Sequence, residues 1–131
     1  MHMPSRLAPM AAIAFACLAL PAVAADRVHA GQWESTWTGG GRSRTVSNCM
    51  SQGDADAMNG DAKAVRAYLE KIIPPSICKL SDIQLSGGKI VYTSVCNGMT
   101  NVITTTYHGD SFESTDSQGS TSQAKRTGPC K

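Results

Sequence analysis

Residues 78–96 have the sequence CKLSDIQLSGGKIVYTSVC, which predicts a β-hairpin closed by a disulfide bond. Gly87-Gly88 is typical of the two-residue turn that joins antiparallel strands. A regular turn of this kind would place Cys78 opposite residue 97, one position beyond Cys96. A β-bulge in one strand corrects such an offset. We therefore predict a bulged hairpin here and a Cys78–Cys96 disulfide.

The other cysteines complete this framework. Cys17 lies in an apolar N-terminal stretch, and four cysteines follow it. An even number of cysteines in a small exported domain indicates disulfide bonds. Once Cys78 and Cys96 are paired, Cys49 and Cys130 remain, and we predict a bond between them. Structural zinc sites use closely spaced pairs such as Cys-x-x-Cys, which this chain lacks, so we expect no metal.

Residues 1–24 are typical of a cleaved signal peptide. Arg6 is followed by an alanine-rich apolar stretch and by Ala22-Val23-Ala24, a signal peptidase pattern. We predict cleavage after Ala24, with Ala25 as the alternative. The apolar stretch is shorter than the roughly 20 residues of a transmembrane helix, so we expect no stable membrane insertion after cleavage. A lipoprotein anchored through Cys17 is the disfavoured alternative, because the residues before it are a poor lipidation signal.

Residues 25–131 then form a single disulfide-bonded domain, which we expect in the periplasm. The whole chain has a formal net charge of +2, which is too small to steer nucleic acid to a binding surface. We therefore expect no nucleic-acid partner.

One segment of this domain is helical in character. Val65, Leu69 and Ile72 form a single apolar stripe at helical spacing. Asp61 is a favourable capping residue in front of the stripe, and Pro74-Pro75 ends it. These signals predict a helix over about residues 61–73. Ser51 with Asp54 is typical of a shorter helical turn before it.

The rest of the domain shows strand patterns separated by glycine-rich turns. We expect strands over residues 33–38, 42–50, 78–86, 89–96, 99–107, 111–116 and 123–130. The fold class is mainly β. It is a curved antiparallel meander or a small, partly closed barrel of about six to eight strands, with one inserted α-helix and two disulfides.

A recurring order of residues resembles a known family. The order is Gly31-x-Trp33, Cys49, Cys78, the Gly87-Gly88 hairpin, Cys96, Tyr107-x-Gly109-Asp110-Ser111-Phe112 and Arg126-x-Gly128-x-Cys130. It resembles the bacterial exported family catalogued as domain of unknown function 3617, over about residues 31–130. The resemblance implies a small periplasmic β-rich domain without assigned catalytic residues. The segment over residues 54–73 is longer and more helical than the resemblance implies.

A weaker likeness concerns architecture. A Gly-x-Trp on the first strand and an arginine near the last strand are similar to the signature of lipocalin-type (calycin) barrels. In those barrels the arginine packs over the tryptophan and closes one end. Trp33 and Arg126 are the candidates for this structural cap. A guanidinium can stack on an indole while its N–H groups bond strand-end carbonyls.

Enzymatic chemistry has little support in the sequence. His108-x-Asp110-Ser111 contains the residue types of a hydrolase triad, but residues along one turn do not converge as a triad does. Asp54-x-Asp56 begins like a calcium loop, but Met58 and Val65 stand at ligand positions. We expect no enzyme and no cofactor.

The leading functional hypothesis is lipocalin-like binding of a small apolar ligand on one face of the sheet. The residues expected to face it are Trp37, Ile83, Leu85, Val102 and Tyr107. These side chains would also suit an ordinary core, and the small number of aromatic residues favours a filled interior over a roomy pocket. The alternative is a structural or protein-interaction module of the cell envelope, for which the Ser/Thr-rich strands supply an exposed face.

Overall fold

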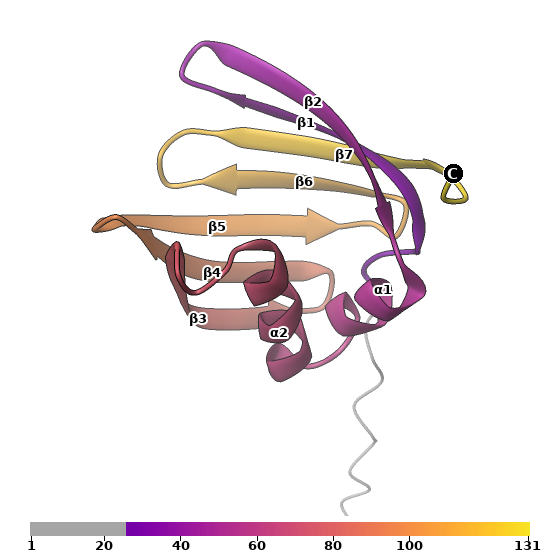
Figure 1. The fold of residues 1–131 in the computed structure, drawn as a ribbon, viewed down its shortest axis with the longest axis horizontal. Coiled ribbons are helices and arrows are strands. Elements are labelled where there is room, and N and C mark those ends of the chain that lie inside the picture. The colour runs from indigo at the N-terminus through magenta and orange to yellow at the C-terminus, as the bar shows by residue number, and fades with distance from the viewer. Residues whose placement is uncertain (1–25) are drawn as a thin grey trace, which may run out of the picture.

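The computed structural model describes residues 26–131, which form one antiparallel sheet with two helices against one of its faces (Figure 1). The predicted signal peptide, residues 1–24, and Cys17 lie outside the described residues. The strands are β1 (Gly31–Gly39), β2 (Arg42–Met50), β3 (Cys78–Ser86), β4 (Lys89–Cys96), β5 (Met99–Tyr107), β6 (Ser111–Asp116) and β7 (Thr121–Gly128). The helices are α1 (Gln52–Met58) and α2 (Ala62–Ile72).

The strand order is β2-β1-β7-β6-β5-β4-β3, and the sheet is not closed into a barrel. The predicted mainly β antiparallel fold is therefore confirmed, in its open form. The chain runs as a meander from β3 to β7, and β7 then pairs with β1. This pairing extends from Thr38 opposite Thr121 to Gln32 opposite Gly128. It places the last strand two residues earlier than the predicted range of 123–130.

The β3–β4 hairpin contains the predicted bulge. Near the turn, Ser86 pairs with Lys89, whereas at the open end Cys78 pairs with Cys96. The register shifts between Ser81 and Gln84, where the backbone reaches a positive φ of 53° at Asp82. The bulge brings the two cysteines opposite each other, and the Cys78–Cys96 disulfide is confirmed.

The second predicted disulfide, Cys49–Cys130, is also confirmed. It joins edge strand β2 to the residues after β7, across a sequence separation of 81. Two disulfides in so small a domain indicate an oxidising, exported environment. Within residues 26–131, neither helix is long and apolar enough to cross a membrane.

The predicted helix is confirmed as α2, and the shorter turn before it is a separate helix, α1. Asp61 caps α2 by accepting a hydrogen bond from the Ala64 amide at 2.9 Å. Ser51 caps α1 in the same way, at 3.1 Å from the Asp54 amide. Because a capping side chain satisfies an amide that has no partner within the helix, both helices begin at these residues.

The helices cover only part of the sheet. Figure 1 shows α2 in front of β3 and β4, and α1 beside it next to the end of β2, whereas the β1–β2 hairpin extends beyond both helices. We call the helix-covered face the inner face and the opposite one the outer face. The buried apolar side chains that form the core are Val28, Trp33, Ala55, Met58, Val65, Leu69, Leu80, Ile90 and Ala124. The part of the inner face that extends beyond the helices is the end of β1, β2 and β7 near the β1–β2 turn, where Trp37 and Val46 are exposed.

Arg27 joins three parts of this fold, although the sequence shows no signal for such a role. Its side chain is buried, and Nη1 donates to the carbonyls of Met58 and Gly60 at 2.9 and 3.0 Å. Its Nε donates to the Gly87 carbonyl in the β3–β4 turn at 2.9 Å. One guanidinium thus connects the start of the described chain, the junction between the helices and a hairpin turn.

Candidate ligand-binding site

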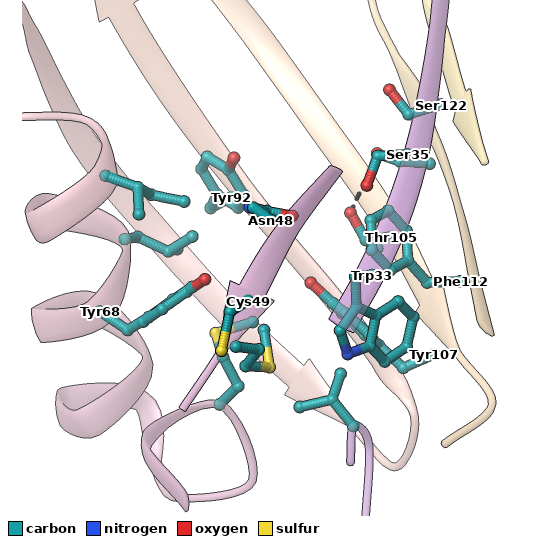
Figure 2. A pocket seen from close by; sticks show the side chains of 16 residues that line it. Trp33, Ser35, Asn48, Cys49, Tyr68, Tyr92, Thr105, Tyr107, Phe112 and Ser122 are labelled. Carbon is teal, nitrogen blue, oxygen red and sulfur yellow. Dashed lines mark hydrogen bonds between the residues drawn. The ribbon is translucent and has the colours of Figure 1, made fainter. Parts of the chain in front are cut away.

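A cavity of about 290 Å³ lies between the helices and the inner face of the sheet (Figure 2). We call it the inner cleft. Its volume is at the lower end of the roughly 300–1,000 Å³ of small-molecule sites. Its lining residues are Val28, Trp33, Ser35, Asn48, Cys49, Met50, Met58, Tyr68, Leu69, Ile72, Tyr92, Thr105, Tyr107, Phe112, Ser114 and Ser122.

One wall of the inner cleft is a row of aromatic rings. Trp33 on β1 stacks on Phe112 on β6, with ring centroids 5.8 Å apart, and Phe112 packs against Tyr107 on β5 at 5.4 Å. Between β1 and β6 lies β7, which contributes the small side chain of Ala124 opposite Phe112. A small residue there leaves room for the two rings to meet across the strand.

Trp33 belongs to the wall, and its polar atom is already bonded. Its side chain is 3% exposed, and its Nε1 donates to the His29 carbonyl at 3.0 Å. A buried indole N–H with a partner inside the protein has no hydrogen bond left to give. Trp33 therefore offers an apolar surface to the cleft.

Tyrosines from three elements contribute hydroxyl groups to the cleft. Tyr68 comes from α2, Tyr92 from β4 and Tyr107 from β5, and Figure 2 shows Tyr68 reaching from the helix toward the strands. Burial raises the pKa of each phenol above its ordinary value, most strongly for Tyr107. All three therefore remain neutral hydroxyls at physiological pH.

The chemistry of the inner cleft is apolar with neutral hydrogen-bonding groups. Its lining includes no charged side chain. Its polar groups are hydroxyls and the Asn48 amide. A buried ion would lose its hydration here without a charged partner, which is costly. The cleft is therefore suited to an uncharged group or to a hydrocarbon.

A second hollow continues along the uncovered part of the inner face. It has a volume of about 470 Å³ and is lined by Ser35, Trp37, Arg44, Val46 and Ser122. We call it the outer groove because it lies outside the helix-covered cleft. Like the inner cleft, it is on the inner face of the sheet. Ser35 and Ser122 line both hollows, so the inner cleft and the outer groove adjoin at these two small side chains.

The apolar surface of the outer groove is exposed. Trp37 is 43% exposed and Val46 42% exposed. The Trp37 ring lies over Gly39, where a Cβ atom would come within 2.7 Å of it. Glycine at this position thus allows the indole to lie close to the strand at the end of the groove.

The structure divides the five residues that the sequence predicted to face a ligand. Tyr107 lines the inner cleft and Trp37 the outer groove. Ile83 and Leu85 are half-buried and pack against the core. Val102 lies on the outer face and is partly exposed. An odd number of positions separates it from Tyr107 on the same strand, and alternate side chains of a strand point to opposite faces.

Several lining residues were not predicted from the sequence. Tyr68 follows Val65 by three positions on α2, so helical periodicity alone would have placed it near the buried stripe. Phe112 is the second residue of the predicted strand over residues 111–116, but the face to which it points has no local signal. Asn48 and Val46 had no local signal, because their position depends on how β2 pairs with β1.

The candidate cap residues Trp33 and Arg126 are opposite each other in the β1–β7 pair. The Arg126 Nε donates to the Ala30 carbonyl at 2.6 Å. The side chain crosses Gly31, whose φ is 144° and where a Cβ atom would overlap the guanidinium and the Gly128 carbonyl. Glycine is therefore required at this position. Stacking of Arg126 on Trp33 stays a prediction, since the stacking partner that the structure shows for Trp33 is Phe112.

Replacing Arg126 by alanine should lower the melting temperature by several degrees. The change removes the hydrogen bond to Ala30, a loss of about 1–2 kcal/mol for a charged donor at a half-buried site. Thermal unfolding monitored by circular dichroism measures the shift. Lys125→Ala is the matched control, because that exposed neighbour lies on the outer face. Equal melting temperatures for the Arg126 variant and the wild type would contradict this role.

The histidine cluster of the β5–β6 turn is not arranged as a triad. The ring of His108 contacts Glu113 at 3.4 Å, whereas Asp110 contacts Nδ1 of His29 at 2.8 Å. The hydrogen bond that His29 donates to the Asp110 carboxylate raises the pKa of His29, and its hydrogen bond to Asp26 raises this pKa further. These exposed contacts connect the start of the described chain to the turn.

One known protein family matches nearly all of the described domain. The family described as "Protein of unknown function (DUF3617)" matches residues 28–130. The chain belongs to this family. The DUF3617 match includes every strand, both helices and both disulfides of the structure. No curated protein and no solved structure matches the chain. The family description assigns no activity, so function is inferred from the site.

Proposed function

We propose that this protein is an exported periplasmic domain that binds a small, mainly apolar ligand in the inner cleft and the outer groove. The observation that supports the proposal most is the adjoining pair of hollows on one face of the sheet. Their walls present aromatic and aliphatic surface with a few neutral hydroxyls and, in the outer groove, the charged Arg44, which is the usual composition of a small-molecule site.

The uneven cover of the sheet supports the same proposal. The helices close the β3–β5 half and give the domain its core, so the exposed Trp37 and Val46 are not needed to complete that core. Exposed apolar side chains that adjoin a hollow are typical of binding surfaces.

Replacing Ser122 by phenylalanine should weaken ligand binding by about fivefold to a hundredfold. Ser122 lies where the inner cleft adjoins the outer groove, so the new ring would occupy ligand space. Overpacking of this kind costs about 1–3 kcal/mol. Gln123→Phe is the matched control, because its side chain lies on the outer face of the same strand.

Native mass spectrometry of protein purified from the periplasm is the direct measurement. We expect a co-purified molecule on the wild type and on the Gln123 variant, with its occupancy reduced on the Ser122 variant. Equal occupancy in the two variants would place the molecule elsewhere. A wild-type protein without any bound molecule, which also fails to take up an apolar fluorescent dye, would contradict ligand binding.

One observation favours the alternative, a protein-interaction module of the cell envelope. Strand β2 is an edge of the sheet, and eight of its nine residues are exposed. A long exposed edge can accept a strand from another protein. The same mass spectra test this alternative, because a protein partner would appear as a much larger added mass.

A further inference from the structure

The open end of the outer groove is basic. Arg42 and Arg44 project from β2 onto the inner face, where Arg42 is opposite Gly39 and Arg44 is opposite Trp37. Both side chains are exposed, and within residues 26–131 neither forms an ion pair. Arg44 lines the groove itself, and Arg42 lines the hollow beyond Trp37. Two cations therefore adjoin the exposed indole.

No acidic side chain in the described residues neutralises this end of the groove. Glu34 is on the neighbouring strand but on the outer face, as its alternation with Trp33 requires. Asp116 is on the inner face, but within residues 26–131 it forms no ion pair with either arginine. Its two carboxylate oxygens face Gln118, Ser120 and Asn101, from which they accept hydrogen bonds. The open end therefore carries a local positive potential, which favours an anion.

The distribution of charge along the site is one-sided. The inner cleft has no charged lining residue, whereas the far end of the groove has arginines. Between the two ends, Trp37 and Val46 provide apolar surface. From Trp33 to Trp37 the strand advances by roughly 13 Å, at about 3.3 Å per residue. A hydrocarbon chain along this path would reach the buried cleft from the charged end.

We infer that the ligand is an anionic amphiphile with a single alkyl chain. This inference rests on the proposed function and assigns a chemical class to its ligand. The alkyl chain lies in the outer groove and the inner cleft, and the anionic head group, a carboxylate or a phosphate, binds at Arg42 and Arg44. Guanidinium groups bind both anions through paired N–H donors, whereas the uncharged cleft excludes the head group from the other end.

Isothermal titration calorimetry with four ligands of equal chain length tests the inference. The ligands are decanoate, decyl phosphate, decanol and decylamine. We expect the anions to bind about fivefold or more tightly than decanol, and decylamine to bind most weakly. Because the arginines are exposed, this preference should shrink as salt is added. The relative affinities of decanoate and decyl phosphate identify which head group fits better.

The double variant Arg42→Gln, Arg44→Gln tests the head-group site itself. It should bind decanol as the wild type does and bind decanoate no more tightly than decanol. Lys125→Gln, which removes a positive charge from the outer face, is the matched control and should keep the preference for anions. If the double variant also loses decanol binding, the arginines maintain the structure of the groove rather than bind the head group, and the inference is overturned.

The outcomes separate the two proposals. Equal affinity of the wild type for decanol and decanoate would overturn the anionic head group and leave apolar binding in place. If none of the four ligands binds while the periplasmic protein still carries a small molecule, the inference fails and the proposed function stands. If neither binding nor a co-purified molecule is found, both fail.

Discussion

Replacing Cys49 and Cys130 together by alanine is expected to lower the free energy of unfolding by about 4.5 kcal/mol. The bond connects residues separated by 81 positions, and the entropy that a cross-link removes from the unfolded chain grows with that separation. A loss of this size is a large part of the roughly 5–15 kcal/mol of a typical domain. The melting temperature should fall by at least about 15 °C. Urea denaturation followed by circular dichroism measures the free-energy change.

The single variants provide an internal control for this prediction. Cys49→Ala and Cys130→Ala each remove the whole bond, so each should destabilise the protein as much as the double variant does. The Cys78–Cys96 bond spans only 18 positions, and its loss should cost less, about 3 kcal/mol. Additive effects of the two single variants would show that the cysteines contribute separately, contrary to the prediction.

Replacing Arg27 by alanine is expected to cost about 4 kcal/mol. The change leaves the carbonyls of Met58, Gly60 and Gly87 without their guanidinium donor. An unsatisfied buried polar group costs about 1–3 kcal/mol, and water can reach part of this site once the side chain is gone. Burial lowers the pKa of Arg27, but an arginine remains charged at neutral pH, so its donors are charge-assisted. Denaturation in urea is again the measurement.

Two further variants separate geometry from charge at this site. Arg27→Lys keeps the charge but lacks the planar set of donors that reaches three carbonyls, so it should recover only part of the lost stability. Arg42→Ala removes an exposed arginine and should change stability by less than about 0.5 kcal/mol. If Arg27→Ala were as mild as Arg42→Ala, the anchoring role of Arg27 would be wrong.

The features that the sequence predicted well depend on residues that are close in the chain. The glycine turn of the β3–β4 hairpin and the spacing of its cysteines together implied the bulge that the structure shows at Asp82. The caps and the apolar stripe of α2 lie within one helix, where a fixed period of about 3.6 residues relates them. The second disulfide followed because only two cysteines remained.

The candidate site was predicted less well, because its walls come from distant segments. Trp37 and Tyr107 were predicted and line the hollows, but Tyr68 enters from α2 and Val46 from an edge strand. Val102 was assigned to the wrong face of the sheet, although the sequence itself contains the information that would have corrected it. Its position relative to Tyr107 already assigns the two side chains to opposite faces of β5.

By itself, the sequence determined the type and extent of most elements, the hairpins and the disulfide pairs. These depend on local periodicity, on turn residues and on the number of cysteines. The tertiary structure alone decided that β7 pairs with β1, that the helices cover one half of the sheet, and that Arg27 reaches a carbonyl 60 positions away. Such contacts form only when the whole chain packs, because packing and backbone hydrogen bonding between distant segments leave no pattern at short range. The uncovered inner face, and with it the proposed ligand site, follows from that packing.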